Sequence, residues 1–107
     1  MKYNIFLAID AEQDIFDIYQ YIFYNDSPKN AEYVFNKIKE TIDRLSEFPE
    51  RGHLPREFDK INIKDFLEIH FKPYRIIYQI SEENVVVHCV LDGRRELEEL
   101  LHKRLLR

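Results

Sequence analysis

The chain has 107 residues, of which 45% are hydrophobic and 34% charged, a balance typical of one folded domain and not of a disordered chain. The net charge of −4 argues against a duplex-binding domain, because such domains are usually basic. A single cysteine excludes an intrachain disulfide. No apolar run approaches the roughly 18 residues of a membrane span, so we expect one cytoplasmic domain over residues 1–107.

The N-terminal residues predict a strand and then an amphipathic helix. Residues Tyr3–Ile9 are apolar and β-prone, which is typical of a strand. Asp10 is the expected N-cap of the helix, with Gln13 three residues later as in a capping box. Asp14 is assigned to the polar side of this helix, which should end at Asn25. The apolar side is formed at helical spacing by Ile15, Ile18, Tyr19 and Ile22.

A second helix is predicted to begin directly afterwards. Ser27 can cap its free amides, and Pro28 suits the first helical position because that position has no amide partner to lose. The helix should end near Pro49, and its apolar stripe comprises Ala31, Val34, Phe35, Ile38, Ile42 and Leu45. Two such helices joined by a tight turn form a helical hairpin.

The C-terminal half predicts a loop, three strands and a short helix. Prolines and a glycine mark Pro49–Asn62 as a loop. Three β-prone runs follow with short links, which favours an antiparallel meander: Ile63–Phe71, Tyr74–Ile80 and Val85–Leu91. The last run is apolar on both faces, as expected for a central strand. Arg94–Arg107 has helical leucine spacing at Leu97, Leu100, Leu101 and Leu105.

The order of elements predicts an α+β fold, β-α-α-β-β-β-α, in which the helical hairpin lies across one face of a twisted antiparallel sheet. Three stretches in this order carry a family resemblance: Ala31–Gly52, where the helix runs into LSEFPERG; PYRIIYQI at Pro73–Ile80; and VVVHCVLDGRRELEELLHKRLL at Val85–Leu106. Over nearly its whole length the chain resembles the RelE/ParE toxin superfamily.

The resemblance implies a toxin that a small antitoxin silences, usually encoded beside it, as in plasmid stabilization systems. In ParE-like members the target is DNA gyrase, and the poisoned complex blocks replication. In RelE-like members the toxin enters the ribosomal A site and cleaves the messenger. The two branches share a fold, so the choice between them depends on side chains.

The residues at the RelE-like catalytic positions favour the ParE branch. Arg75 and Arg95 match two basic positions of the ribonucleases, but Leu101 stands where the tyrosine of their C-terminal helix should be. Asp92 and Gly93 replace the His-Tyr pair of other members. Instead of a row of lysines, the neighbouring strand carries Glu68, His70 and Lys72. DGRR followed by a basic, leucine-rich tail is the ParE-like pattern.

The leading prediction is therefore a protein-binding inhibitor of gyrase, which docks through the hairpin and the C-terminal tail. Its expected antitoxin is ParD-like, with a ribbon-helix-helix segment, and DNA is contacted only through the antitoxin complex. Candidate residues for binding the target or the antitoxin are Arg75, Arg94, Arg95, Leu97, Leu101 and Arg104. The alternative is a ribosome-dependent mRNA endoribonuclease that uses Arg75, Arg95 and His70, with the histidine as general base. A third alternative is an inactive chain retained for antitoxin binding.

Several of the charged and titratable residues can also have a purely structural role. Arg75 can pair with Glu68 or another carboxylate, the commoner fate of a strand arginine. His88 and Cys89 lie in an apolar run, which predicts a packed histidine and a small core residue. His53 falls in the loop and His102 in the last helix, and neither has a partner at metal-ligand spacing. The sequence thus predicts no metal site and no cofactor.

Overall fold

A computed structural model describes residues 2–56, 66–93 and 103–104. Its elements are β1 (Asn4–Leu7), α1 (Ile9–Asn25), α2 (Pro28–Asp43), the 3-10 turns η1 (Arg44–Ser46) and η2 (Pro49–Arg51), β2 (Phe66–Phe71), β3 (Tyr74–Ser81) and β4 (Asn84–Asp92). The start of the predicted strand Ile63–Phe71, residues 63–65, lies outside the described residues. So does the predicted C-terminal helix, apart from Lys103 and Arg104. None of the described helices is long and apolar enough to cross a membrane.

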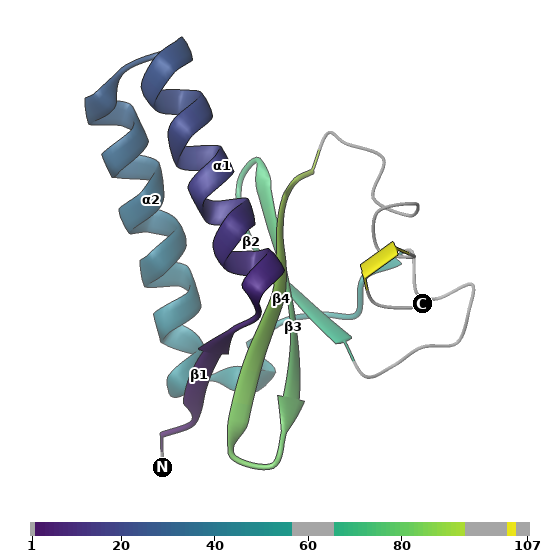
Figure 1. The fold of residues 1–107 in the computed structure, drawn as a ribbon. Coiled ribbons are helices and arrows are strands. Elements are labelled where there is room, and N and C mark those ends of the chain that lie inside the picture. The colour runs from purple at the N-terminus through teal and green to yellow at the C-terminus, as the bar shows by residue number, and fades with distance from the viewer. Residues whose placement is uncertain (1, 57–65, 94–102, 105–107) are drawn as a thin grey trace.

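The described strands form one four-stranded sheet in the order β1-β4-β3-β2, with the α1–α2 hairpin along one side of it (Figure 1). β2, β3 and β4 form the predicted antiparallel meander. β1 adds to β4 in parallel, from Asn4 opposite Asn84 to Leu7 opposite Val87, so the sheet is mixed. The sequence did not predict this direction, because short links fix the pairing of neighbouring strands only. β4 is central, as predicted.

The two helices begin differently. Ser27 caps α2, since its Oγ accepts a hydrogen bond from the Asn30 amide at 3.0 Å and Pro28 occupies the first turn, as predicted. The predicted cap of α1 is wrong: Ala8 is the N-cap, without a side-chain bond, and Asp10 lies in the first turn. The Ala8 amide donates to the Val87 carbonyl at 2.9 Å. α1 therefore begins directly after β1, and Ala8 takes the N-cap position in place of Asp10.

The core fills the space between the hairpin and the sheet. It includes side chains that are at most 1% exposed from both layers: Ala11, Ala31, Ile38, Leu45, Ile76, Tyr78, Val85, Val87 and Val90. α2 ends at Asp43 and not near Pro49, and the chain continues through η1 and η2. These turns keep Leu45 and Pro49 buried. The predicted apolar stripe is therefore buried except for Phe35, which is 39% exposed.

Tyr78 attaches the segment after α2 to the sheet. Its side chain is 0% exposed, and its hydroxyl donates to the Pro49 carbonyl at 2.6 Å and accepts from the Gly52 amide at 3.0 Å. A Cβ at Gly52 would lie 2.5 Å from that hydroxyl and 2.7 Å from the Glu68 carbonyl oxygen, so the close approach requires glycine. His53 then pairs with Glu68 through two backbone hydrogen bonds, of 3.0 and 2.7 Å.

Asp14 ties α1 to the far end of β4. β1 accompanies β4 only as far as Val87, and the amide of Val90 donates instead to Asp14 Oδ2 at 3.0 Å. Arg104 Nη1 donates to the same oxygen at 2.5 Å. Asp14 is 8% exposed, so its assignment to the polar side of the helix was wrong. It lies three residues after Ala11 and four before Ile18, on the buried face.

Replacing Tyr78 with phenylalanine should lower the free energy of unfolding by about 1–3 kcal/mol, because the partly buried Gly52 amide and the buried Pro49 carbonyl both lose their partner. Urea denaturation of Tyr78→Phe measures this change. Tyr24→Phe is the matched control, since Tyr24 is 75% exposed and its change should stay within about 0.5 kcal/mol. Equal effects of the two variants would contradict the anchoring role.

Asp14→Ala should lower the free energy of unfolding by about 3 kcal/mol. It leaves the Val90 amide without its acceptor and the partly buried Arg104 guanidinium without its counter-charge. The control on the same helix is Asp17→Ala, whose exposed carboxylate accepts a hydrogen bond from Gln13. Amide hydrogen exchange gives a second measurement: the Val90 amide should lose protection in Asp14→Ala and keep it in Asp17→Ala.

Candidate functional site

Four charged or titratable side chains meet on and beside the face of the sheet turned away from the core. Side chains alternate along a strand, so Glu68 and His70 of β2 share one face, while their neighbour Ile69 belongs to the core. The strand register places Arg75 of β3 directly opposite His70. The backbone pair with Glu68 brings His53 to the edge of β2.

Glu68 and Arg75 form a buried, two-pronged ion pair. The Glu68 side chain is 1% exposed and the Arg75 side chain 16%. Arg75 Nε donates to Oε2 at 2.5 Å and Nη2 donates to Oε1 at 2.6 Å, the parallel geometry in which a guanidinium holds a carboxylate most strongly. This arrangement confirms the structural alternative in which Arg75 pairs with Glu68.

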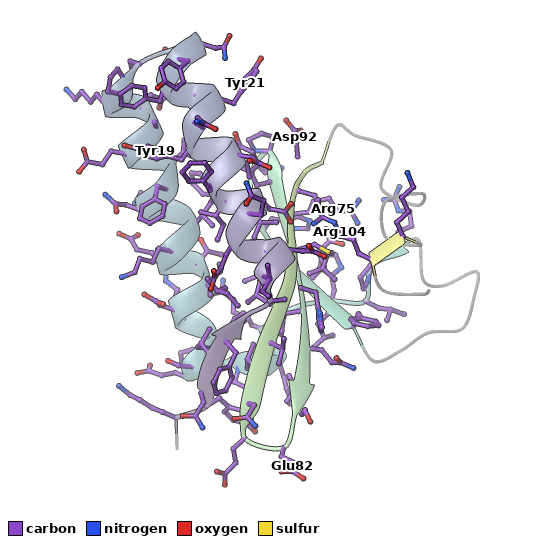
Figure 2. All side chains as sticks on the ribbon, in the orientation of Figure 1. Tyr19, Tyr21, Arg75, Glu82, Asp92 and Arg104 are labelled. Carbon is purple, nitrogen blue, oxygen red and sulfur yellow. The ribbon has the colours of Figure 1, made fainter. Side chains whose placement is uncertain are left out.

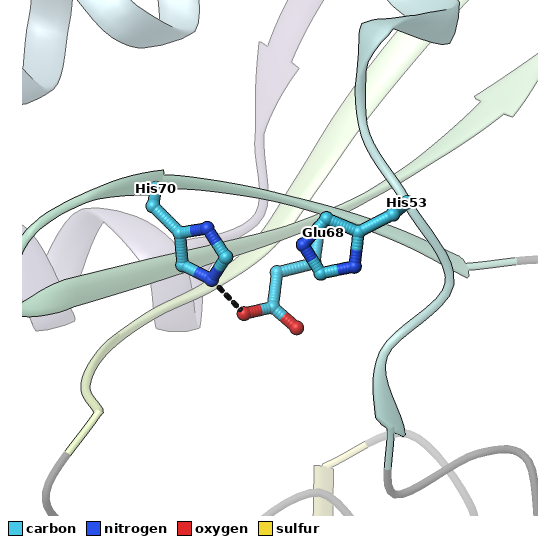
Figure 3. Close-up of side chains that lie close together, drawn as sticks. All are labelled: His53, Glu68 and His70. Carbon is cyan, nitrogen blue, oxygen red and sulfur yellow. Dashed lines mark hydrogen bonds and ion pairs between the residues drawn. The ribbon is translucent and has the colours of Figure 1, made fainter.

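Two histidines complete the cluster (Figure 3). His70 Nε2 lies 2.5 Å from Glu68 Oε2, and its side chain is 40% exposed. The ring of His53 stacks at a tilt of 37° with its centroid 5.2 Å from that of His70. The prediction that His53 has no partner at metal-ligand spacing was wrong, because a backbone pair between residues far apart in the chain brings it to Glu68 and His70. No local sequence signal marks that pair.

The cluster is close to electrically balanced. One buried carboxylate faces one guanidinium, and the two imidazoles add charge only when they are protonated. Chemically, the group can move a proton between His70 and Glu68, and it offers imidazole nitrogens and a carboxylate oxygen as ligands. One such atom each from His53, Glu68 and His70 lies within 4.8 Å of the others, a grouping that could hold a metal ion.

The remaining predicted site residues fall into two groups. Arg104 is bound to Asp14, and this hydrogen bond raises the pKa of its guanidinium further above the usual value. The other candidates, Arg94, Arg95, Leu97 and Leu101, lie outside the described residues. Asp14 was missed as a partner, although an acid at an apolar-face position of a helix is a readable signal.

His88 and Cys89 have the packing roles predicted for them. His88 Nε2 lies 3.1 Å from Gln79 Oε1, its ring meets Phe66 edge-on, and burial lowers its pKa. Cys89 is 0% exposed, and burial raises the pKa of its thiol to about 11. A thiol of this kind remains protonated at neutral pH and is a poor nucleophile.

A second surface feature lies on the outside of the hairpin. We call it the hairpin groove: a hollow of about 570 Å³ between α1 and α2 lined by Glu12, Ile15, Phe16, Tyr19, Glu32, Phe35 and Asn36. It continues into a hollow of about 270 Å³ that reaches Ile5 and Leu7 of β1. Tyr19 points toward α2, where its ring meets Phe35 edge-on at 6.1 Å (Figure 2). Phe16 and Phe35 are 54% and 39% exposed, so the groove is apolar and open.

Comparison with solved structures shows which fold this is. The chain is similar to a toxin–antitoxin structure described as the chromosomal ParDE system from P. aeruginosa, with a TM-score of 0.71, 12% identity and coverage of 83% of this chain and 94% of that chain. It is also similar to a double mutant of the E. coli toxin RelE in the free state, with a TM-score of 0.67, 18% identity and coverage of 100% of this chain and 98% of that chain. The RelBE2 toxin–antitoxin complex from Mycobacterium tuberculosis gives a TM-score of 0.59 at 20% identity, covering 84% and 96%. These likenesses show the RelE/ParE-like fold.

Sequence comparison shows the family. The curated protein Toxin ParE3 from Caulobacter vibrioides is 29% identical over 92 residues, which are 85% of this chain and 87% of that protein. Residues 5–97 match the family described as "ParE toxin of type II toxin-antitoxin system, parDE". Because this match spans most of the sequence, the chain belongs to the ParE toxin family of type II toxin–antitoxin systems.

Proposed function

We propose that this chain is a cytoplasmic toxin that inhibits DNA gyrase, and hence replication, by binding to it, and that a cognate ParD-like antitoxin neutralises it. The hairpin and the C-terminal tail are the proposed contact surfaces, and the tail carries the candidate residues Arg94, Arg95, Leu97, Leu101 and Arg104. Under this proposal the chain acts by occupying another protein and contributes no catalytic group.

The buried ion pair between Glu68 and Arg75 is the observation that supports inhibition by binding over RNA cleavage. A ribonuclease of this fold would use a sheet arginine to stabilise charge on the phosphate. Here the two carboxylate oxygens of Glu68 already bind the guanidinium, and only 16% of its side chain is exposed. Moving Arg75 onto a phosphate would leave a carboxylate that is 1% exposed without its charge partner, which is costly.

The hairpin groove supports the antitoxin part of the proposal. An amphipathic segment that folds on binding can place apolar side chains in such a groove. Phe16, Tyr19 and Phe35 offer the aromatic surface that such contacts use. Carboxylates at Glu12 and Glu32 line the same groove, so a segment with a few basic residues beside its apolar ones fits it best.

Endoribonuclease activity is a second candidate function, favoured by one observation. His70 and Arg75 share a sheet face and adjoin the carboxylate of Glu68, so a general base and a phosphate-binding group stand together. The carboxylate would orient the His70 imidazole, as the third member of a catalytic triad does. Cleavage by this route would depend on both His70 and Arg75.

The two candidate functions predict different effects of removing the Glu68–Arg75 ion pair on the activity of the chain. A substitution of Arg75 alone would leave the Glu68 carboxylate without its counter-charge. The double variant Glu68→Leu/Arg75→Leu therefore replaces both partners by apolar groups, a change that is often nearly neutral for stability. We expect wild type and double variant to inhibit gyrase supercoiling in a purified assay to the same extent, with His70→Ala behaving likewise. Cutting of messenger in translating ribosomes by wild type, lost in both variants, would replace the gyrase proposal by the ribonuclease one.

Binding of the antitoxin should depend on the hairpin groove. Phe35→Ala removes an aromatic anchor and should weaken antitoxin binding by about 2 kcal/mol, or roughly 30-fold, as measured by titration calorimetry with the antitoxin from the neighbouring reading frame. Phe48→Ala is the control, since Phe48 is 63% exposed and lines a different hollow. Equal affinity of Phe35→Ala and wild type would place the antitoxin elsewhere.

A further inference from the structure

We propose that His53, Glu68 and His70 form a binding site for a divalent late transition-metal ion, with Zn²⁺ as the representative ion. One ligand atom from each residue lies within 4.8 Å of the other two, and Figure 3 shows the three side chains converging. Two imidazoles and one carboxylate are the ligand set of zinc sites that keep a fourth position for water. Mg²⁺ and Ca²⁺ fit less well, because they prefer oxygen ligands throughout.

The backbone holds the three residues in place before any ion binds. Glu68 and His70 are two positions apart on β2, so their side chains project from the same face. His53 exchanges both backbone hydrogen bonds with Glu68, at 3.0 and 2.7 Å. Tyr78 and Gly52 fix the residues just before His53 to the sheet. The ligands therefore belong to one rigid unit.

Only small side-chain rotations are needed to close the site. Ligand atoms bonded to zinc at about 2.0 Å lie about 3.3 Å apart in a tetrahedron. Because all three ligand atoms lie within 4.8 Å of one another, no separation must shrink by more than about 1.5 Å. Glu68 is fixed, but His53 is exposed and the His70 side chain is 40% exposed. Rotation of the exposed His53 imidazole toward the other two ligands can supply this movement. His70 Nε2, now 2.5 Å from Glu68 Oε2, must move about 0.8 Å away from it to admit the ion. The exposure of both imidazoles gives an ion access to the site.

The hydrogen bonds around the cluster prepare the ligands. His53 Nδ1 lies 3.2 Å from the Leu54 carbonyl oxygen, and a carbonyl only accepts, so the bond places the proton on Nδ1 and leaves the Nε2 lone pair available. A histidine ligand commonly donates its other N–H in this way. At His70 the ion takes the place of the proton shared between Nε2 and Glu68 Oε2. Any proton released in this exchange goes to solvent.

Arg75 has two opposite effects on the proposed site. By binding both oxygens of Glu68, it holds the carboxylate in one orientation, as outer-shell groups do in metal sites. Its positive charge also repels an incoming cation. We therefore expect an affinity below that of a closed four-ligand structural site.

The test uses the full-length chain without an affinity tag, stripped with chelator and titrated with Zn²⁺ by calorimetry and with Co²⁺ by visible absorption. We expect one ion per chain, and Co²⁺ bands whose intensity indicates four or five ligands. His53→Asn and His70→Asn should each weaken binding by at least about tenfold. Both histidines are exposed, so these variants should fold, and far-ultraviolet circular dichroism checks this.

His88→Asn is the matched control, because His88 lies on the same sheet but contacts Gln79 and Phe66. It should bind the ion as wild type does. Failure of wild type to bind Zn²⁺ or Co²⁺ stoichiometrically would overturn the proposal. Binding that persists in the His53→Asn/His70→Asn double variant would overturn it as well. Neither readout involves gyrase or an antitoxin, so this test and that of the proposed function succeed or fail separately.

Discussion

Glu68 carries a carboxylate that is 1% exposed, and much of the chemistry of this sheet face follows from compensating that charge. Arg75 from the next strand supplies the counter-charge through two hydrogen bonds, and His70 supplies a third contact. The pair links β2 to β3 across their register. It also engages the arginine that a phosphate-binding surface would employ.

Other buried polar contacts stand where the regular ladder of the sheet ends. Asp14 accepts from the Val90 amide beyond the end of β1, and Tyr78 bonds to the backbone at Pro49 and Gly52. Buried backbone groups almost always have hydrogen-bond partners. Asp14 and Tyr78 supply such partners for backbone groups that no neighbouring strand reaches. The same fold occurs in solved relatives of 12–20% identity that include both ParDE and RelBE members. A shared fold does not fix the function, which depends on the side chains at the site.

Features set by neighbours in the chain could be predicted from the sequence, whereas those set by distant residues could not. Ser27 and Pro28 mark a helix start by themselves, and the alternation around Glu68 and His70 defines a sheet face. The direction of β1 was beyond prediction because its partner begins at Asn84. His53 reaches His70 only through a backbone pair with Glu68. The Asp14–Val90 bond spans 76 residues, and no periodicity indicates its acceptor.

The backbone pair at His53 also affects how the sheet terminates. β2 lies at one edge of the sheet, and an uncovered edge strand invites another molecule to extend the ladder. The N–H and C=O of His53 occupy the outward backbone groups of Glu68, near the middle of β2. At the opposite edge β1 has only four residues. Extension of the sheet by another molecule is therefore hindered at β2 by the pair with His53 and limited at β1 by the length of that strand.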